Sequence, residues 1–157
     1  MKAFRYKDNG LQSFNFLFPL AAGNLKQMLR GSLNHDRIFY RSQNLWNQFE
    51  GLAGALAFLH EECNTAHRDL KLSNILLYEY DNPPSLLAKI TDFGLAMNLE
   101  NITTHSQGTK DLISAIHYDA PEARNFYNED DPSSEPPSPS DLTAGDVWKL
   151  GAVFTPQ

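Results

Sequence analysis

The residues best able to do chemistry lie in four short segments of the 157-residue chain. They are residues 67–74 (His-Arg-Asp-Leu-Lys-Leu-Ser-Asn), 92–94 (Asp-Phe-Gly), 120–122 (Ala-Pro-Glu) and 146–151 (Asp-Val-Trp-Lys-Leu-Gly). Carboxylate and amide oxygens of the kind they carry are the hard ligands that Mg²⁺ prefers. A single Asp or Asn in a loop usually meets solvent or closes a turn. All four segments in this order form a far more specific pattern than any one of them.

Taken together, the four segments resemble the signature set of eukaryotic protein kinases. The resemblance runs from about Tyr6 to about Phe154, with insertions. It implies an α+β, protein-kinase-like fold and the transfer of a phosphoryl group from Mg-ATP to a protein hydroxyl. Such chemistry depends mostly on positioning and on neutralising charge. A lysine at position 71 resembles the Ser/Thr class more than the tyrosine kinases.

The resemblance implies a role for each residue that would meet substrate or nucleotide. Asp69 would accept the proton of the substrate hydroxyl, and Lys71 would lie against the γ-phosphate as a point charge. Asn74 and Asp92 would supply oxygen ligands to Mg²⁺. Leu76 would lie beneath the adenine ring, so the implied ATP-binding set is Lys71, Asn74, Leu76 and Asp92.

Other positions resemble structural parts of a kinase. His67 and Phe93 resemble stacked internal residues that link the catalytic loop to the metal-binding segment. Asp146 resembles a buried carboxylate that holds the catalytic-loop backbone from a later helix. Gly94 would give the backbone freedom to turn after the metal-binding aspartate. Glu122 resembles a residue that normally pairs with a late arginine, which these 157 residues lack.

Arg68, directly before Asp69, suggests control by phosphorylation, because arginine pairs well with phosphate. The candidate acceptors are Thr103, Thr104 and Ser106. An Arg68→Ala variant with unchanged dependence on phosphorylation would contradict this hypothesis.

The substrate-binding loop has two possible interpretations. Gly108-Thr109 resembles its Gly-Thr pair, but residues 110–117 then separate that pair from Tyr118. Alternatively, Ser114-Ala115 takes its place and the loop threonine is lost. Both interpretations stay open.

The surrounding pattern predicts the elements that position these segments. Phe4 to Tyr6 and the alternating Phe14, Phe16 and Phe18 predict a hairpin over residues 1–20. Asn24 is a candidate N-cap for a short helix. Residues 75–78 and 86–91 predict a second hairpin around a turn rich in Asn and Pro.

One long helix is expected in the first half of the chain. A stripe with spacings of 4, 3, 4 and 3 predicts it; the stripe consists of Leu45, Phe49, Leu52, Leu56 and Leu59. Gly51 and Gly54 would let a neighbouring element pack closely. The long segment 97–117 is mixed in character and indicates a loop.

The expected organisation is one partial kinase domain. Residues 1–21 would be the last small-lobe strands and the hinge, and residues 22–126 and 142–157 would form the large lobe. The acidic, Pro/Ser-rich residues 127–141 should be disordered, with a helix starting near Leu142 and capped by Asp141 or Ser140. No Gly-x-Gly-x-x-Gly loop occurs, so we expect a truncated domain whose isolated chain is weak or inactive.

Bulk composition excludes some other classes. A net charge of −6 predicts no general attraction to nucleic acid or to an anionic membrane. No apolar run is long enough to span a bilayer and no secretory signal is evident, so a cytoplasmic or nuclear location is expected. ATP and a protein substrate are the expected partners.

Two alternative functions stay open. The chain could be a non-catalytic binding module of kinase-like fold, although intact Asp69, Asn74 and Asp92 argue against long decay. It could also be a small-molecule phosphotransferase of that fold, but Lys71 and the Asp-Phe-Gly and Ala-Pro-Glu segments favour protein substrates.

Overall fold

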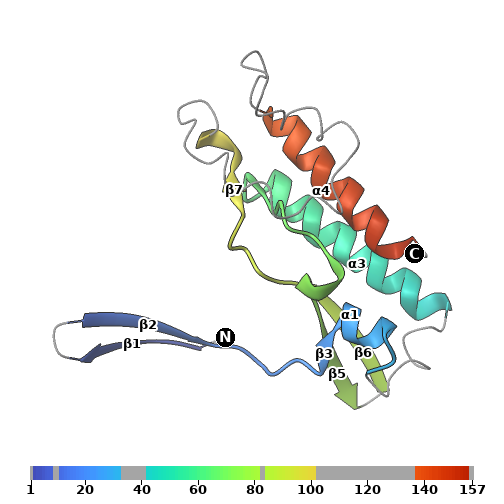
Figure 1. Cartoon of the computed structure of the whole chain (residues 1–157), viewed down its shortest axis with the longest axis horizontal. Coiled ribbons are helices and arrows are strands. Elements are labelled where there is room, and N and C mark those ends of the chain that lie inside the picture. Colours follow the sequence, from blue (N-terminus) through green and yellow to red (C-terminus); the bar gives the residue numbers. More distant parts are fainter. Residues whose placement is uncertain (1, 9–10, 33–41, 82–83, 102–136, 156–157) are drawn as a thin grey trace.

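The computed structural model describes residues 2–8, 11–32, 42–81, 84–101 and 137–155. Its frame is a pair of long helices, α3 (Ser42–Glu61) and α4 (Pro139–Phe154), which lie side by side (Figure 1). The rings of Phe49 on α3 and Phe154 on α4 meet edge to face, with centroids 5.0 Å apart. Small sheets and a short helix, α1 (Leu25–Leu29), complete the described part.

The apolar stripe predicted for the long helix forms the packed face of α3. Leu52 and Leu56 are buried, and the other three members of the stripe pack against the same core while partly exposed. The expected role of the two glycines is wrong. A Cβ atom built on Gly51 or Gly54 would meet nothing within 4 Å. They therefore lie on an open face of the helix and make no close contact with any neighbour in the described part of the chain.

The second predicted hairpin is confirmed as β5 (Ile75–Asp81) and β6 (Pro84–Ile90), in antiparallel register from Ile75↔Ile90 to Asp81↔Pro84. A short strand that the sequence did not suggest, β3 (Gly23–Asn24), joins the other edge of β5. Gln48 Oε1 on α3 accepts a hydrogen bond of 2.7 Å from the backbone N–H of Ala88. This contact ties the hairpin to the long helix.

Asn24 caps α1 as predicted. Its side chain accepts from the backbone N–H of Gln27, while the Gln27 side chain accepts from the backbone N–H of Asn24. This reciprocal pair is a capping box, which satisfies two backbone donors that a short helix leaves open. Leu25 and Met28 then bury the inner face of the helix.

A further pair of short strands was not predicted. Strand β4 (Thr65–Ala66) pairs antiparallel with β7 (Met97–Asn98), and a 3-10 turn, η2 (Leu99–Asn101), follows. The beginning of the expected loop 97–117 is therefore ordered structure. The pairing also brings the chain just before residue 67 beside the chain just after residue 94, so both candidate segments lie in one part of the fold.

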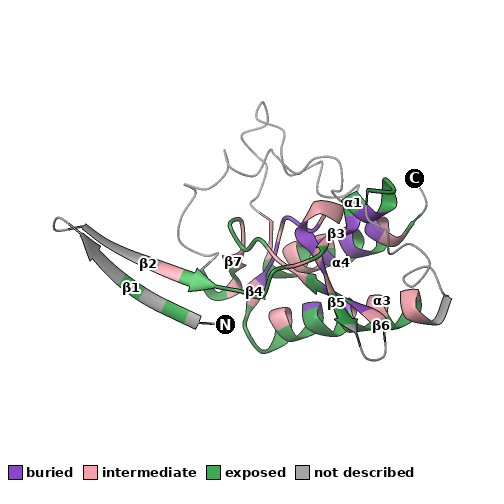
Figure 2. Cartoon of the chain, turned by 90° about the horizontal axis from the view of Figure 1, so that it is seen from below, coloured by how far each residue is buried: buried purple, intermediate pink, exposed green. Residues whose placement is uncertain are grey.

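The first hairpin is confirmed as β1 (Lys2–Asp8) and β2 (Leu11–Leu17), in register from Lys2↔Leu17 to Asp8↔Leu11. It extends away from the rest of the described chain in both views (Figures 1 and 2). Phe16, Leu17 and Phe18 are mostly exposed.

Helix α4 begins earlier than predicted, at Pro139 instead of near Leu142. Its N-cap is Ser138, whose hydroxyl accepts from the backbone N–H of Asp141, while the Asp141 carboxylate accepts from the backbone N–H of Ser138. The prediction of disorder is therefore wrong for residues 139–141. A Ser-Pro start with an acid at the third helical position is a strong helix signal that outweighs the Pro/Ser-rich composition.

The buried core residues come from α1, α3, α4, the loop before β5 and the β5–β6 hairpin (Figure 2). Burying one such leucine or isoleucine side chain stabilises the fold by about 1.5–3 kcal/mol. The core consists of Leu25, Met28, Leu52, Leu56, Leu70, Ile75, Leu77, Leu86, Ala88, Leu150 and Val153. Within the described residues, no helix is both long and apolar enough to cross a bilayer.

Candidate active site

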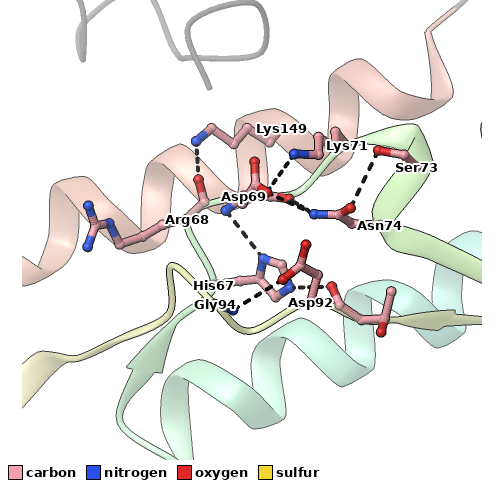
Figure 3. Close-up of polar contacts among 10 residues, drawn as sticks. His67, Arg68, Asp69, Lys71, Ser73, Asn74, Asp92, Gly94 and Lys149 are labelled. Carbon is pink, nitrogen blue, oxygen red and sulfur yellow. Dashed lines mark hydrogen bonds and ion pairs between the residues drawn. The ribbon is translucent and has the colours of Figure 1, made fainter. Parts of the chain in front are cut away.

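Three predicted site residues meet in the loop between β4 and β5. The Asp69 carboxylate oxygen Oδ2 accepts from Lys71 Nζ at 2.6 Å and from Asn74 Nδ2 at 2.9 Å. Asn74 Nδ2 also donates to the Asp69 backbone carbonyl at 2.9 Å. Figure 3 shows the three side chains pointing toward one another. A 3-10 turn, η1 (Leu72–Asn74), brings Asn74 back toward Asp69.

The two partners of the Asp69–Lys71 ion pair differ in their exposure to solvent. Asp69 is buried, whereas 37% of the Lys71 side chain is exposed. A partly exposed ammonium beside a buried carboxylate can keep that contact and still reach a second anion in solution. This arrangement suits a residue that mediates between a protein carboxylate and a phosphate group.

His67 lies below this cluster and is completely buried. Its Nε2 donates to the Thr91 carbonyl at 3.0 Å, and its Nδ1 accepts from the backbone N–H of Asp69 at 3.3 Å. Only the neutral ring with its proton on Nε2 can make both bonds. Burial lowers the pKa of His67, although the Thr91 carbonyl and the carboxylates of Asp146, Asp69 and Asp92 act in the opposite direction. The neutral histidine therefore joins the two candidate segments by hydrogen bonds.

Asp92 lies two residues after the end of β6 and turns the chain at a positive φ of 67°. The backbone N–H of Thr91 donates to the Asn74 carbonyl at 2.9 Å, which places the two metal-ligand candidates on adjoining backbone segments. The Asp92 side chain is exposed.

The expected role of Gly94 needs correction. The left-handed residue of this turn is Asp92 itself, and Gly94 has no positive φ. Its backbone N–H donates to Asp92 Oδ1 at 3.3 Å, and a Cβ built on it would lie 3.2 Å from the same oxygen. The glycine thus leaves room for the carboxylate and gives no special backbone freedom.

Phe93 also departs from expectation. Its ring meets the His67 ring with centroids 4.9 Å apart, but at an interplanar angle of 60°, edge to face and not stacked. His67 is internal, whereas Phe93 is 51% exposed. The pairing was therefore predicted correctly, but its geometry and the burial of Phe93 were not.

Asp146 is fully buried on α4 and accepts three hydrogen bonds. Its Oδ1 accepts from the backbone N–H of Arg68 at 2.7 Å, and its Oδ2 accepts from the backbone N–H of His67 at 2.6 Å. The third donor is His60 Nε2 at 3.0 Å, at the end of α3. Sequence reasoning missed His60. Its place at the C-terminal end of the apolar stripe was the available signal.

Lys149 was missed as well. It is buried on α4, one turn beyond Asp146, and its Nζ donates to the Arg68 carbonyl at 2.6 Å. Arg68 itself has a positive φ of 69°. Nothing in the sequence distinguished Lys149 from the exposed lysines typical of helices.

The remaining predicted residues do not belong to this hydrogen-bonded cluster or lie outside the described residues. Leu76 is half-buried in the middle strand of its sheet, between Asn24 and Lys89. Glu122, the candidate phosphate acceptors and both candidate positions of the Gly-Thr pair lie outside the described residues.

The side chains present fit a magnesium ion that is shared with a nucleotide. No group of three or more His, Cys, Asp and Glu residues in the described chain could hold a metal. Asn74 offers its amide oxygen, which also accepts a long hydrogen bond of 3.4 Å from Ser73 Oγ, and Asp92 offers an exposed carboxylate. Mg²⁺ is usually bound through one or two carboxylates together with substrate phosphates and water. Asn74 and Asp92 would therefore hold the ion only together with phosphate oxygens.

Comparisons with known proteins identify the family of this chain. Residues 6–155 match the protein kinase domain family. Cold-responsive protein kinase 1 of Arabidopsis thaliana is 40% identical over 103 residues, which are 62% of this chain and 24% of that protein. Phytosulfokine receptor 2 of the same plant is 38% identical over 136 residues, 81% of this chain and 11% of that protein.

A third relative is a G-type lectin S-receptor-like serine/threonine-protein kinase of Arabidopsis thaliana. It is 42% identical over 79 residues, which are 49% of this chain and 9% of that protein. The chain thus spans a quarter or less of the length of these relatives. Because the family match covers nearly all 157 residues, the chain belongs to the protein kinase family.

Proposed function

We propose that this chain carries the catalytic loop and the metal-binding segment of an ATP-dependent protein serine/threonine kinase. The observation that carries the proposal is the buried Asp69 carboxylate, whose Oδ2 is held by Lys71 and Asn74. A carboxylate oriented in this way is the group needed to accept the proton of an attacking hydroxyl.

The two oxygens of Asp69 have different surroundings. Oδ2 accepts from both Lys71 and Asn74, whereas Oδ1 accepts no hydrogen bond from any residue that the structure describes. Oδ1 is therefore the atom assigned to the substrate hydroxyl. The two bonds at Oδ2 fix the carboxylate plane, so the acceptor oxygen is oriented before substrate arrives.

The charges around Asp69 provide the second part of the mechanism. Lys71 is partly exposed and lies 2.6 Å from Asp69 Oδ2, so its ammonium can also face the transferred phosphoryl group. Magnesium, held by Asn74 and Asp92 together with the nucleotide, would neutralise phosphate charge when bound. Each of these contacts would stabilise charge where it develops during transfer.

Lys71 and the relative named as a serine/threonine kinase support a serine or threonine hydroxyl as acceptor. The 157-residue chain by itself should bind Mg-ATP weakly and be weak or inactive in transfer. Its sequence contains no Gly-x-Gly-x-x-Gly loop to cover the phosphates.

The direct test is titration calorimetry of Mg-ATP with the purified, folded chain. Asp92→Ala should abolish binding, because it removes the carboxylate assigned to the metal. Asp69→Asn should bind Mg-ATP as the native chain does, because Asp69 is assigned to the hydroxyl and not to the nucleotide. In a radiolabelled phosphotransfer assay, Asp69→Asn should lose whatever transfer to serine and threonine peptides the native chain shows.

Either of two results would count against the proposal. If the folded native chain binds no Mg-ATP, this polypeptide is not an enzyme by itself, and a non-catalytic binding module becomes the better description. If Asp92→Ala binds Mg-ATP as tightly as the native chain, the assigned metal site is wrong. Transfer to a small-molecule hydroxyl but to no peptide would favour the small-molecule phosphotransferase.

A further inference from the structure

The backbone of Arg68 is held by helix α4 at both of its polar groups. Its N–H donates to Asp146 Oδ1 at 2.7 Å, and its carbonyl accepts from Lys149 Nζ at 2.6 Å. Arg68 has a φ of 69°, in the left-handed region that residues other than glycine seldom adopt. An unfavourable conformation of this kind persists only where surrounding contacts enforce it. Figure 3 shows the Lys149 contact beside Asp69.

The two contacts come from one turn of one helix. Residues three apart lie on the same helix face, so Asp146 and Lys149 face the catalytic loop together. Asp146 is fully buried and Lys149 is 6% exposed. Burying an ammonium group is unfavourable unless it donates hydrogen bonds. The 2.6 Å contact from Lys149 Nζ to the Arg68 carbonyl is one such hydrogen bond.

The peptide group that Lys149 contacts is also the one that begins Asp69. Because a peptide bond is planar, the Arg68 carbonyl and the Asp69 N–H move as one rigid unit. Lys149 binds the carbonyl side of this unit, and His67 Nδ1 accepts from its N–H side at 3.3 Å. A change at Lys149 should therefore be felt at the backbone of Asp69, in the neighbouring residue.

We propose that Lys149 is a positioning residue for phosphoryl transfer, which holds the Arg68–Asp69 peptide plane and so orients the Asp69 carboxylate. This inference rests on the proposed function, because it assumes that Asp69 accepts the substrate proton. Lys149 is buried and donates to the Arg68 carbonyl, so we assign it a positioning role and no direct contact with substrate or nucleotide. Its effect should appear in the turnover number and not in the affinity for Mg-ATP.

The test is amide hydrogen exchange at Asp69 in Lys149→Met, a substitution that keeps an unbranched chain of similar length and removes the donor. Exchange at Asp69 should become about 10- to 100-fold faster, the loss expected for one hydrogen bond to a charged group. Leu52 and Leu56 in α3 report global stability and should exchange as slowly as before. Lys26→Met removes an exposed lysine on α1 and is the matched control with no change at Asp69.

A second variant separates the hydrogen bond from general packing. Lys149→Gln keeps an N–H donor on a slightly shorter side chain and should restore most of the protection at Asp69. The assignment is overturned if Lys149→Met leaves Asp69 exchange unchanged. It is equally overturned if Asp69, Leu52 and Leu56 all accelerate together, because Lys149 would then be a general stability residue.

A kinetic measurement tests whether the hydrogen bond from Lys149 to the Arg68 carbonyl matters for catalysis. In the native chain's phosphotransfer reaction, Lys149→Met should lower kcat roughly 10- to 100-fold, the cost of misplacing a catalytic group by about 1 Å, with KM for ATP unchanged. A rise in KM at constant kcat would overturn the positioning role. If the native chain is inactive in transfer, the exchange experiment alone decides whether Lys149 holds this peptide, and the proposed function is judged separately by Mg-ATP binding.

Discussion

Asp146→Asn is the substitution whose cost follows most directly from the structure. The Asp146 carboxylate is fully buried and accepts from the backbone N–H groups of His67 and Arg68 and from His60 Nε2. Asparagine has nearly the same shape but only one acceptor oxygen. Its amide N–H₂ must replace either Oδ1 or Oδ2, and it would then face at least one N–H donor.

The expected cost can be worked out from these bonds. If the amide oxygen takes the place of Oδ2, the bonds to His67 and His60 remain without their charge, and the Arg68 bond is lost. A bond to a charged group contributes about 1.5–3 kcal/mol, and a buried donor left unpaired costs about 1–3 kcal/mol more. We therefore expect a loss of about 3–5 kcal/mol in the free energy of unfolding, against a typical total of about 5–15 kcal/mol.

The assay is urea unfolding followed by tryptophan fluorescence, which reports on Trp46 in α3 and Trp148 in α4. Glu62→Gln, at an exposed position just after α3, removes a carboxylate charge of the same kind and should leave the midpoint unchanged. A loss below about 1 kcal/mol for Asp146→Asn would mean that its three bonds are not important for stability. The reasoning about α4 as the anchor of the catalytic loop would then fail.

Three further substitutions or conditions test other parts of the fold. Burial lowers the pKa of His67 in the folded chain, so the unfolded chain binds a proton more readily. The free energy of unfolding should therefore be at its full value above about pH 6.5 and should fall as the pH drops below that value. Urea midpoints from about pH 7.5 down to about pH 5.5 check this, and a midpoint that does not change over this range would contradict it. Gly54→Ala should stabilise the chain by about 0.5–1 kcal/mol, because its Cβ would meet nothing within 4 Å; a lower thermal midpoint would show a hidden contact. Ser138→Ala should cost about 0.5–2 kcal/mol by removing the N-cap of α4, measured by urea unfolding, and an unchanged midpoint would mean that the cap contributes nothing.

Local patterns were sufficient for most elements near the site. The 3-4 spacing of apolar residues predicted α3, alternation and a Pro-rich turn predicted β5 and β6, and Asn24 predicted the cap of α1. These features depend on neighbours in sequence, so periodicity and capping chemistry can reveal them. The start of α4 was also readable, but the Ser138–Asp141 signal was overlooked in favour of the surrounding composition.

Such local patterns could not predict the two-residue strands. The β4–β7 pair and strand β3 exist because distant backbone segments meet and satisfy each other's hydrogen bonds. A pair of residues such as Thr65 and Ala66 has no period to detect. Sequence reasoning therefore described the first part of the segment after residue 94 as loop.

By itself, the sequence determined the family, because four spaced motifs are a local property of the chain. Only the tertiary structure decided how they are held. It showed that Asp92, not Gly94, has the positive φ, that Phe93 stays half exposed, and that α4 clamps the backbone before Asp69. The partnership of Lys149 with Arg68 crosses 81 residues of chain. A lysine in a helix is usually exposed, so its burial could be learned only from the packing around it.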